Sequence, residues 1–275
     1  MRKIIRLLFA LIILLAALQV VFMLKVKIDK SVNLIPSLGS LNTSVAPPGY
    51  PGAVPEVKKE VILEGIGEKM IYDVKMGKIT LGKSTFTHAD RVDLDGRKVH
   101  LMIFETKLSR FIDTERIYVD PETLLPVQVE RDILNFFNRE KITEKYDAKE
   151  FTVSISKKRG AKNETQVIKK DAPLHNAILL PHFVRRAAKL DIGSILIANL
   201  PTSRYELKLV SLEDITVPAG TFKTYHFEST PKKIEIWISA DERKVPVKIQ
   251  SCAAFGYVMT LREYHIPAVV IADKN

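Results

Sequence analysis

Cysteine is almost absent from this chain, since Cys252 is the single one among 275 residues. One thiol cannot form an intrachain disulfide, and a metal site built from several cysteines is excluded. No histidine stands beside it in residues 250–254 to activate the thiol, so a buried or idle thiol is favoured over a nucleophile. No cysteine lies near the N-terminus, which excludes the lipid-modified cysteine of a bacterial lipoprotein.

Catalytic motifs are missing as well. The sequence contains no Gly-x-Ser-x-Gly elbow, no phosphate-binding loop and no dinucleotide fingerprint. Paired carboxylates for acid–base chemistry would have to come from Asp113, Glu115 and Asp120, or from Asp241 with Glu242. Turn chemistry explains these residues better, because Asp-Pro-Glu-Thr at 120–123 is typical of a type I turn. We therefore expect no enzyme, no catalytic residue and no cofactor.

The histidines are few and scattered. No two of them form a His-x-His or His-x3-His pair; the six are His88, His100, His175, His182, His226 and His265. His175 and His182 are seven residues apart and could share a helix face, but no acidic residue completes a ligand set there, and Pro181 disturbs the register. The pattern therefore predicts no metal site.

The chain is basic, with a formal net charge of +10. Its Lys and Arg residues are spread over strand-like segments, and no nucleic-acid-binding motif is present, so we expect no nucleic acid as partner. Next to a bilayer the same charge attracts anionic headgroups, by about 1 kcal/mol per basic residue near the surface. The charge therefore favours a membrane-associated domain.

One long hydrophobic run stands near the N-terminus. Residues 7–24 carry no charge and a single amide, Gln19, and their length approaches the roughly 20 residues that cross a bilayer as a helix. Three basic residues in 1–6 precede the run, as in signal peptides and signal anchors. Because no clear small-x-small cleavage site follows, we predict an uncleaved transmembrane anchor at 7–24, with residues 1–6 in the cytoplasm.

The remainder divides into a tether, a domain and a tail. Residues 25–60 contain five prolines and several glycines, which predicts an extended, stiff tether. From 61 to 265, short alternating or β-branched segments separated by turns predict one antiparallel β domain, followed by a tail at 266–275. The predicted strands are 70–76, 99–104, 116–119, 127–130, 151–156, 205–212, 221–228, 234–239, 247–250 and 257–264.

A helix and a repeated hairpin organise this domain. Apolar residues at helical spacing predict a helix at 174–190, bent or divided by Pro181. On each side of it, a strand with a central aromatic residue leads through a turn to a strand that opens with Pro-Val, at 117–130 and at 236–250. We therefore expect a curved antiparallel sheet or half-open barrel built from two similar β halves with one intervening helix.

Four groups of residues carry a family resemblance. They are Gly67-Glu68 with Tyr72, residues 179–185 with Gly193, the run Val-Pro-Ala-Gly-Thr-Phe at 217–222, and residues 236–238 with Asp241 and Pro246-Val247. Over about 67–264 the chain resembles an exported bacterial family catalogued as domain of unknown function 3108. The hairpins are also similar to the periplasmic lipoprotein carrier, a curved half-barrel with an apolar concave face. Many relatives are expected to be released or lipidated, and the anchor at 7–24 departs from that pattern. The anchor and the resemblance to an exported bacterial family together predict a single-pass protein of the inner membrane with its C-terminal domain in the periplasm.

Aromatic residues give the candidate binding site. They are Tyr72, Tyr118, Tyr205, Trp237 and Tyr257, and they alternate with aliphatic residues along the strands. One strand face forms the core; the other lines a lipid-binding concavity or lies under the helix. We expect a non-enzymatic, membrane-anchored protein that binds a hydrophobic ligand, either a lipid or a lipidated partner. The alternative is a structural or adaptor component of a cell-envelope protein assembly.

Overall fold

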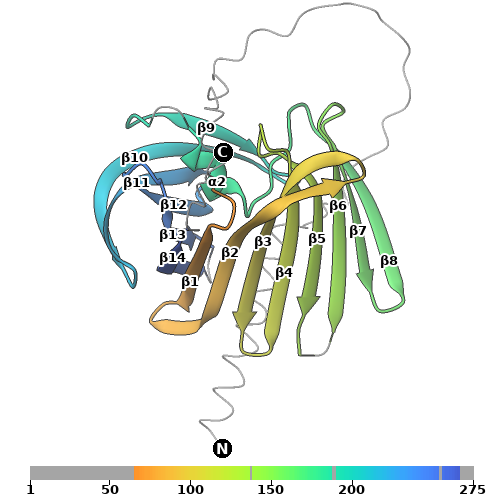
Figure 1. Ribbon diagram of the computed structural model, residues 1–275, viewed down its shortest axis with the longest axis horizontal. Helices are drawn as coiled ribbons and strands as arrows, with labels where there is room; N and C mark the ends of the chain where they lie inside the picture. The colour runs from red at the N-terminus through yellow and green to blue at the C-terminus, as the bar shows by residue number, and fades with distance from the viewer. Residues whose placement is uncertain (1–64, 137, 188–189, 254–255, 267–275) are drawn as a thin grey trace, which may run out of the picture. The chain divides into compact units, whose positions relative to one another are not determined.

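Fourteen antiparallel strands form a single sheet, as expected for a mainly β domain (Figure 1). The computed structural model describes residues 65–266 except 137, 188–189 and 254–255. The predicted membrane segment at 7–24, the tether at 25–60 and residues 267–275 of the tail lie outside the described residues. No helix in the described part of the chain is long and apolar enough to span a bilayer.

The first eight strands form a meander in which each strand pairs with the next in sequence. They are β1 (Lys69–Met76), β2 (Ile79–Leu94), β3 (Arg97–Leu108), β4 (Phe111–Val119), β5 (Pro126–Leu134), β6 (Arg139–Asp147), β7 (Thr152–Arg159) and β8 (Lys162–Lys169). A second meander follows one short helix, α2 (Leu180–Arg185). Its strands are β9 (Ile195–Asn199), β10 (Arg204–Val217), β11 (Gly220–Thr230), β12 (Ile234–Ser239), β13 (Pro246–Ser251) and β14 (Val258–His265).

Pairing of β1 with β14 joins the two meanders into one sheet. Within the described residues, β8 and β9 are therefore its outermost strands. Every predicted strand segment overlaps an observed strand, whereas β2, β6, β8 and β9 were not predicted. Three of these four are rich in charged and polar residues, and β9 is only five residues long, so none has a strong apolar alternation.

The helix is much shorter than the predicted 174–190. It begins after Leu179 with Pro181 in its first turn, where the missing N–H of proline costs no hydrogen bond. Before it the chain is extended, because the His175 amide donates to the carbonyl oxygen of Asn199 in β9, at 2.7 Å. The apolar spacing that suggested one long helix therefore covers two different conformations. The residues around His175 run along β9, and only Leu180–Arg185 are helical.

Both predicted Pro-Val hairpins are present and share an irregularity. In β4–β5 the pairing shifts after Tyr118 so that Val119 lies opposite Pro126. In β12–β13 it shifts after Trp237 so that Ile238 lies opposite Pro246. A bulge at the first residue of the return strand accommodates a residue that has no N–H to donate. The Pro-Val start of the return strand is therefore accompanied by the same register shift in both hairpins.

The main apolar core lies between α2 and the inner face of the second meander. Leu180 and Val184 of α2 pack in one cluster with residues of β9–β12 that include Phe227. Figure 1 shows β10 and β11 bending strongly around α2. Alternation along the strands places the other members of the cluster on the same face: Ala198, Leu200, Leu207, Leu209, Ile236 and Ile238. This α2-facing side is called the inner face below.

An ion pair fastens α2 across the seam between the meanders. Arg185 donates from both terminal nitrogens to the carboxylate of Glu68, just before β1, at 2.7 and 2.9 Å. Tyr264 of β14 donates its hydroxyl to the same carboxylate at 2.7 Å, and Arg185 also donates to the carbonyl oxygen of Arg243. Glu68 is only 4% exposed, so this clasp is formed in a largely desolvated place.

Neutral histidines fill the space beside the clasp. His182 of α2 stacks on Phe86 of β2 with ring centroids 3.8 Å apart. His88 Nε2 and His100 Nδ1 lie 3.1 Å apart, and both rings are buried. Burial, followed by the neighbouring His100, lowers the pKa of His88 to about 4. Burial also holds the pKa of His182 well below its ordinary value, with a further contribution from Arg185.

Loss of Arg185 should destabilise the fold strongly. Arg185→Met leaves the buried Glu68 carboxylate without its cation, which costs about 3–5 kcal/mol of unfolding free energy. Chemical denaturation of the full chain measures this change. Arg139→Met serves as a matched control, because the Arg139–Asp132 pair is largely exposed on the arginine side and should contribute at most about 1 kcal/mol. Equal losses in the two variants would contradict the role of the clasp.

Stability should fall on acidification through His88. The unfolded histidine titrates near 6.5 and the folded one near 4, so below pH 6.5 the unfolded state binds more protons. This single group should lower the free energy of unfolding by about 2 kcal/mol between pH 7.5 and 5. The His88→Gln variant should show a correspondingly shallower slope. An unchanged slope in His88→Gln would refute this account.

Candidate functional site

The five predicted cavity residues are divided between the two faces of the sheet. Tyr72 lies on the inner face, because it follows Met70 at strand spacing and Met70 pairs with Phe86, which contacts α2. It is 2% exposed, and its hydroxyl donates to the carbonyl oxygen of Pro246 at 2.9 Å. Tyr205 pairs with the buried Ala198 and packs against the α2 cluster. Both residues therefore belong to the inner face.

Tyr257, the residue just before β14, also belongs to the inner face. Burial raises its pKa, and the carboxylate of Glu115 raises it further, which places the phenol near the inner face of β4. Glu115 is on that face because it pairs with Phe104, which in turn pairs with Phe86. The structure therefore brings Tyr72, Tyr205 and Tyr257 to the inner face.

Tyr118 and Trp237 lie on the opposite, outer face. Their strand neighbours Ile117 and Ile236 are fully buried on the inner face, so alternation directs these two outward. Trp237 is nevertheless 3% exposed, and its indole N–H donates to Glu213 Oε1 at 2.7 Å. Tyr118 donates weakly to Glu130 at 3.4 Å. These two residues do not share a face with the other three.

The inner face of the first meander carries a polar cluster among buried apolar residues such as Met102, Ile117 and Val129. Arg131 of β5 makes hydrogen bonds to both carboxylate oxygens of Asp113, and its Nε lies 3.2 Å from Glu115 Oε1. The side chains of Arg131 and Asp113 are each 13% exposed, and that of Glu115 is 4% exposed. Nearby, Tyr146 donates to Glu144 at 2.5 Å. The sequence analysis treated Asp113 and Glu115 as turn residues and missed Arg131; the two-residue spacing of Asp113 and Glu115, which puts both on one strand face, was the available signal.

The inner face of the second meander is apolar and covered by α2. Phe227 and its aliphatic neighbours there are completely buried. The helix that covers them has six residues, no side-chain hydrogen bond at its N-cap Leu179, and no acidic residue in its first turn. Such a short, uncapped helix has little stability of its own. Its position therefore depends on packing and on the clasp at Arg185.

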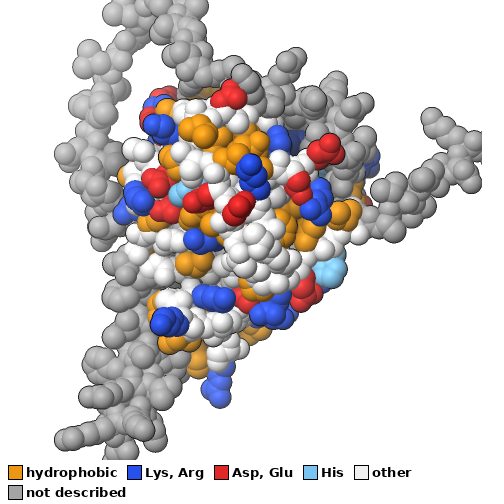
Figure 2. Space-filling view, turned by 90° about the vertical axis from the view of Figure 1, so that its left-hand side faces the viewer, with side chains coloured by type: hydrophobic (Ala, Val, Ile, Leu, Met, Phe, Trp, Pro, Cys, Tyr) orange, Lys and Arg blue, Asp and Glu red, His pale blue; other side chains and the backbone are white. Residues whose placement is uncertain are grey.

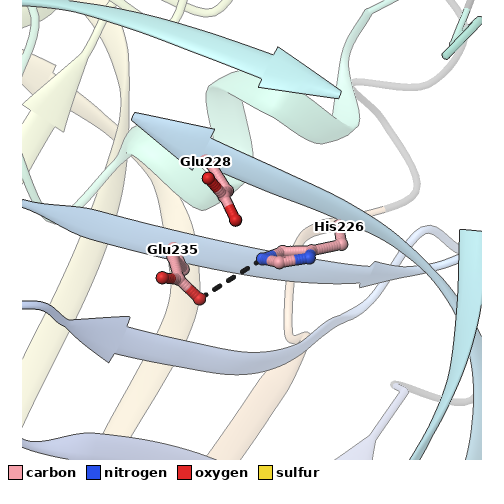
Figure 3. A group of neighbouring side chains, drawn as sticks. All are labelled: His226, Glu228 and Glu235. Atoms are coloured by element: carbon pink, nitrogen blue, oxygen red, sulfur yellow. Dashed lines mark ion pairs between the residues drawn. The ribbon is translucent and has the colours of Figure 1, made fainter. Parts of the chain in front are cut away.

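A second group of interest lies on the outer face of β11 and β12 (Figure 3). His226 and Glu228 are two residues apart on β11, so they point to the same side, and Glu235 of β12 pairs directly with Glu228. One ligand atom from each of the three residues lies within 4.8 Å of the other two. His226 Nε2 is 3.3 Å from Glu235 Oε2. This is the group of metal-ligand side chains that the structure assembles, and the sequence analysis did not predict it.

The surroundings of His226 fix its ring. The imidazole stacks on the Trp237 indole at 4.1 Å with an angle of 9° between the planes. Its Nδ1 lies 3.2 Å from Glu213 Oε1, the oxygen that accepts the indole N–H. On the other side of the ring pair, Lys248 Nζ lies 3.8 Å from the centre of the Trp237 ring. The ring is therefore held with Nε2 toward the two glutamates.

Two further groups touch these glutamates. Lys232 Nζ is 3.1 Å from Glu235 Oε1 and 3.6 Å from Glu228 Oε1. The Cys252 thiol donates to Glu235 Oε1 at 3.3 Å, and burial, followed by this hydrogen bond, raises the pKa of Cys252 to about 11. Figure 2 shows histidine side chains among acidic, basic and hydrophobic ones on one face of the domain. Cys252 is thus a protonated, inactive thiol, as its sequence context predicts.

Solved structures resemble the chain at very low sequence identity. One is a β-barrel-like protein of domain of unknown function DUF1849 from Brucella abortus: 8% identity, TM-score 0.47, covering 74% of this chain and 98% of that chain. Another, named a "putative lipoprotein", is from Parabacteroides distasonis: 11% identity, TM-score 0.27, covering 74% and 96%. A third is a "putative exported protein" with a YmcC-like fold from Bacteroides fragilis: 8% identity, TM-score 0.25, covering 73% and 96%.

Sequence comparison gives a more definite assignment. No curated protein matches the chain. The family model of proteins of unknown function DUF3108 matches residues 71–262, which run from within β1 to within β14. The resemblance based on the hairpins, the turn at 217–222 and the segment 179–185 is therefore confirmed, and the chain belongs to the DUF3108 family.

Proposed function

We propose that this chain is an exported, non-enzymatic protein of the bacterial inner membrane whose periplasmic β domain binds a hydrophobic ligand beneath α2. The ligand is a lipid or the lipid group of a partner. The proposal combines the hydrophobic run at 7–24, the basic residues before it and the apolar inner face of the second meander. That apolar face, covered by a helix with little stability of its own, is the observation that carries it.

In this proposal α2 acts as a lid over the apolar inner face of the second meander. Leu180 and Val184 are the α2 side chains in the apolar cluster, so moving this helix uncovers Phe227 and the aliphatic residues around it. An acyl chain that takes the place of α2 restores the apolar contacts that the sheet loses, at about 25 cal/mol per Å² of buried surface. What opposes the movement is the clasp between Arg185 and Glu68. The clasp therefore sets how readily the lid opens.

We also infer that the domain arose from two similar halves with different inner surfaces. Strands β2–β5 and β10–β13 correspond, because β2–β3 and β10–β11 are long hairpins with a register shift midway and the next hairpins share the Pro bulge. The inner face of the first half holds Arg131 and its carboxylates among apolar residues, whereas that of the second half is the apolar cluster around Phe227 beneath α2. Ligand binding is assigned to the second half.

A photoreactive fatty acid tests this function in membranes that contain the full chain. Cross-linked peptides identified by mass spectrometry should map to α2 and to the inner-face residues of β10–β12. Glu68→Gln weakens the clasp, so labelling of these peptides should rise several-fold relative to wild type. Adducts in the anchor at 7–24 are the internal control for contact with bulk lipid. Adducts confined to 7–24, in both proteins, would refute ligand binding beneath α2.

A second function, that of an adaptor in an envelope assembly, is favoured by the outer edge of β8. Among the described residues, this strand has a neighbour on one side only, and Val167 near its middle is 66% exposed. Lys162 and Lys169 stand at its ends with Glu164 between them, and Lys169 forms an ion pair with Glu150. Addition of an extended segment of an envelope protein would satisfy the free backbone groups of this edge. The sheet edge, and not the inner face, would then be the functional surface.

Proline at position 167 tests the adaptor. The two-residue turn at 160–161 closes the β7–β8 hairpin at the Arg159–Lys162 pair, so the Val167 N–H points away from β7. Val167→Pro removes this donor at an edge, where proline is tolerated, and Val167→Thr keeps it. A purified envelope protein that cross-links to β8 should bind wild type and Val167→Thr at least tenfold more tightly than Val167→Pro. Equal binding to all three proteins would exclude strand addition at β8.

A further inference from the structure

We propose that His226, Glu228 and Glu235 form a binding site for a divalent transition metal, with Zn²⁺ as the preferred ion, on the outer face of β11 and β12. This site is independent of the hydrophobic ligand proposed above, because it lies on the opposite face of the same strands. One imidazole nitrogen and two carboxylates are common zinc ligands, and a water molecule completes a tetrahedral set.

The distances suit a metal of this size. Zinc–ligand bonds of about 2.0–2.2 Å place neighbouring ligand atoms roughly 3.3 Å apart in a tetrahedron. His226 Nε2 and Glu235 Oε2 already have this separation, at 3.3 Å. Glu228 lies within 4.8 Å of both, and its side chain is 37% exposed, so a change of rotamer brings its carboxylate to the ion. Figure 3 shows the three side chains converging from the two strands.

The unpaired atom at the centre of the group points to a cation. His226 Nε2 is buried and has no hydrogen-bond partner among the described residues, although a carboxylate oxygen lies 3.3 Å away. Glu228 and Glu235 are directly opposite each other on antiparallel strands, a placement that is unfavourable for like charges. A metal ion between the three residues satisfies the nitrogen and removes the repulsion between the carboxylates in one step.

Glu213 and Trp237 supply the support that a metal-binding histidine needs. Protein metal sites commonly use a carboxylate beside the second imidazole nitrogen to fix the ring and its tautomer. Glu213 Oε1 lies 3.2 Å from His226 Nδ1 and is itself held by the Trp237 indole N–H at 2.7 Å. Stacking on Trp237 then restricts rotation of the imidazole. Glu213 is thus the positioning residue of the proposed site.

Lys232 is the competitor for the metal. Its ammonium contacts both glutamates, at 3.1 and 3.6 Å, and so provides the positive charge in the metal-free protein. The lysine side chain is 59% exposed and lies at the turn between β11 and β12, so it can leave toward solvent. Charge repulsion between Lys232 and a divalent ion makes the two occupants mutually exclusive. This competition gives the proposal its most distinctive prediction.

Equilibrium dialysis of the untagged, chelator-treated full chain against Zn²⁺, read by elemental analysis, tests the site. We expect one zinc per chain; His226→Gln and Glu228→Gln should each weaken binding at least tenfold, and Lys232→Gln should tighten it several-fold. His265→Gln is the matched control, since His265 Nε2 also lies 3.3 Å from a glutamate, Glu263, but on an exposed strand end without a second carboxylate. This control should bind zinc like wild type.

Two outcomes would overturn the proposal. The first is no zinc bound by wild type or by Lys232→Gln, with unfolding midpoints showing that both proteins are folded. The second is equal binding by wild type, His226→Gln and Lys232→Gln, which would place any bound zinc elsewhere. A Glu213→Gln variant adds a test of positioning, because it leaves all three ligands in place and should still weaken binding about 10- to 100-fold.

Discussion

The bidentate contact between Arg185 and Glu68 is the interaction on which the arrangement of this domain depends. It joins the helix that covers the apolar face of the second meander to the chain just before β1. Tyr264 of β14 shares the same carboxylate, so the helix, β1 and β14 meet at one point. β1 and β14 are also the strands whose pairing unites the two meanders. The buried Glu68 carboxylate thus links α2, which covers the apolar core, to the β1–β14 pair that joins the two meanders.

The clasp determines the position of α2 more than it adds net stability. Buried ion pairs contribute little net stability compared with apolar packing, but breaking one leaves an uncompensated charge. The apolar contacts of Leu180 and Val184 therefore provide the attraction between α2 and the sheet, whereas the clasp fixes which position the helix takes. In the proposed function, a ligand that replaces the apolar contacts also has to break this ion pair.

The sequence predicted the strands that carry a strong apolar pattern, and both Pro-Val hairpins. It did not reveal β6 or β8, because their alternating positions are filled by Lys, Glu and Thr, and only pairing in the sheet makes strands of them. The long helix expected at 174–190 was wrong because apolar residues there contact α2 and β9 from an extended segment. Local pattern reports which residues are buried; it does not report which backbone conformation buries them.

The same limit explains the candidate sites. Tyr72 and Trp237 look alike in sequence, as aromatic residues between aliphatic ones, yet register places one on the inner face and the other beside His226. The metal-ligand group depends on Glu228 standing opposite Glu235, which no spacing along the chain specifies before the β11–β12 turn is known. One partial signal existed, because His226 and Glu228 have the spacing that puts two ligands on one strand face. The third ligand comes from the pairing of the strands.

The outer face also explains why a buried tryptophan stands among charges. Trp237 stacks between the His226 ring and the Lys248 ammonium, while its N–H is bound to Glu213. Packing alone does not require a tryptophan at this position, because a Leu or Phe would fill the space without any polar partner. Lys248 and Glu213 instead hold the indole in place, and the indole and Glu213 fix the plane and direction of the His226 imidazole. The aromatic residue that the sequence marks as a lipid contact is therefore better understood as the support that aims Nε2 at Glu228 and Glu235.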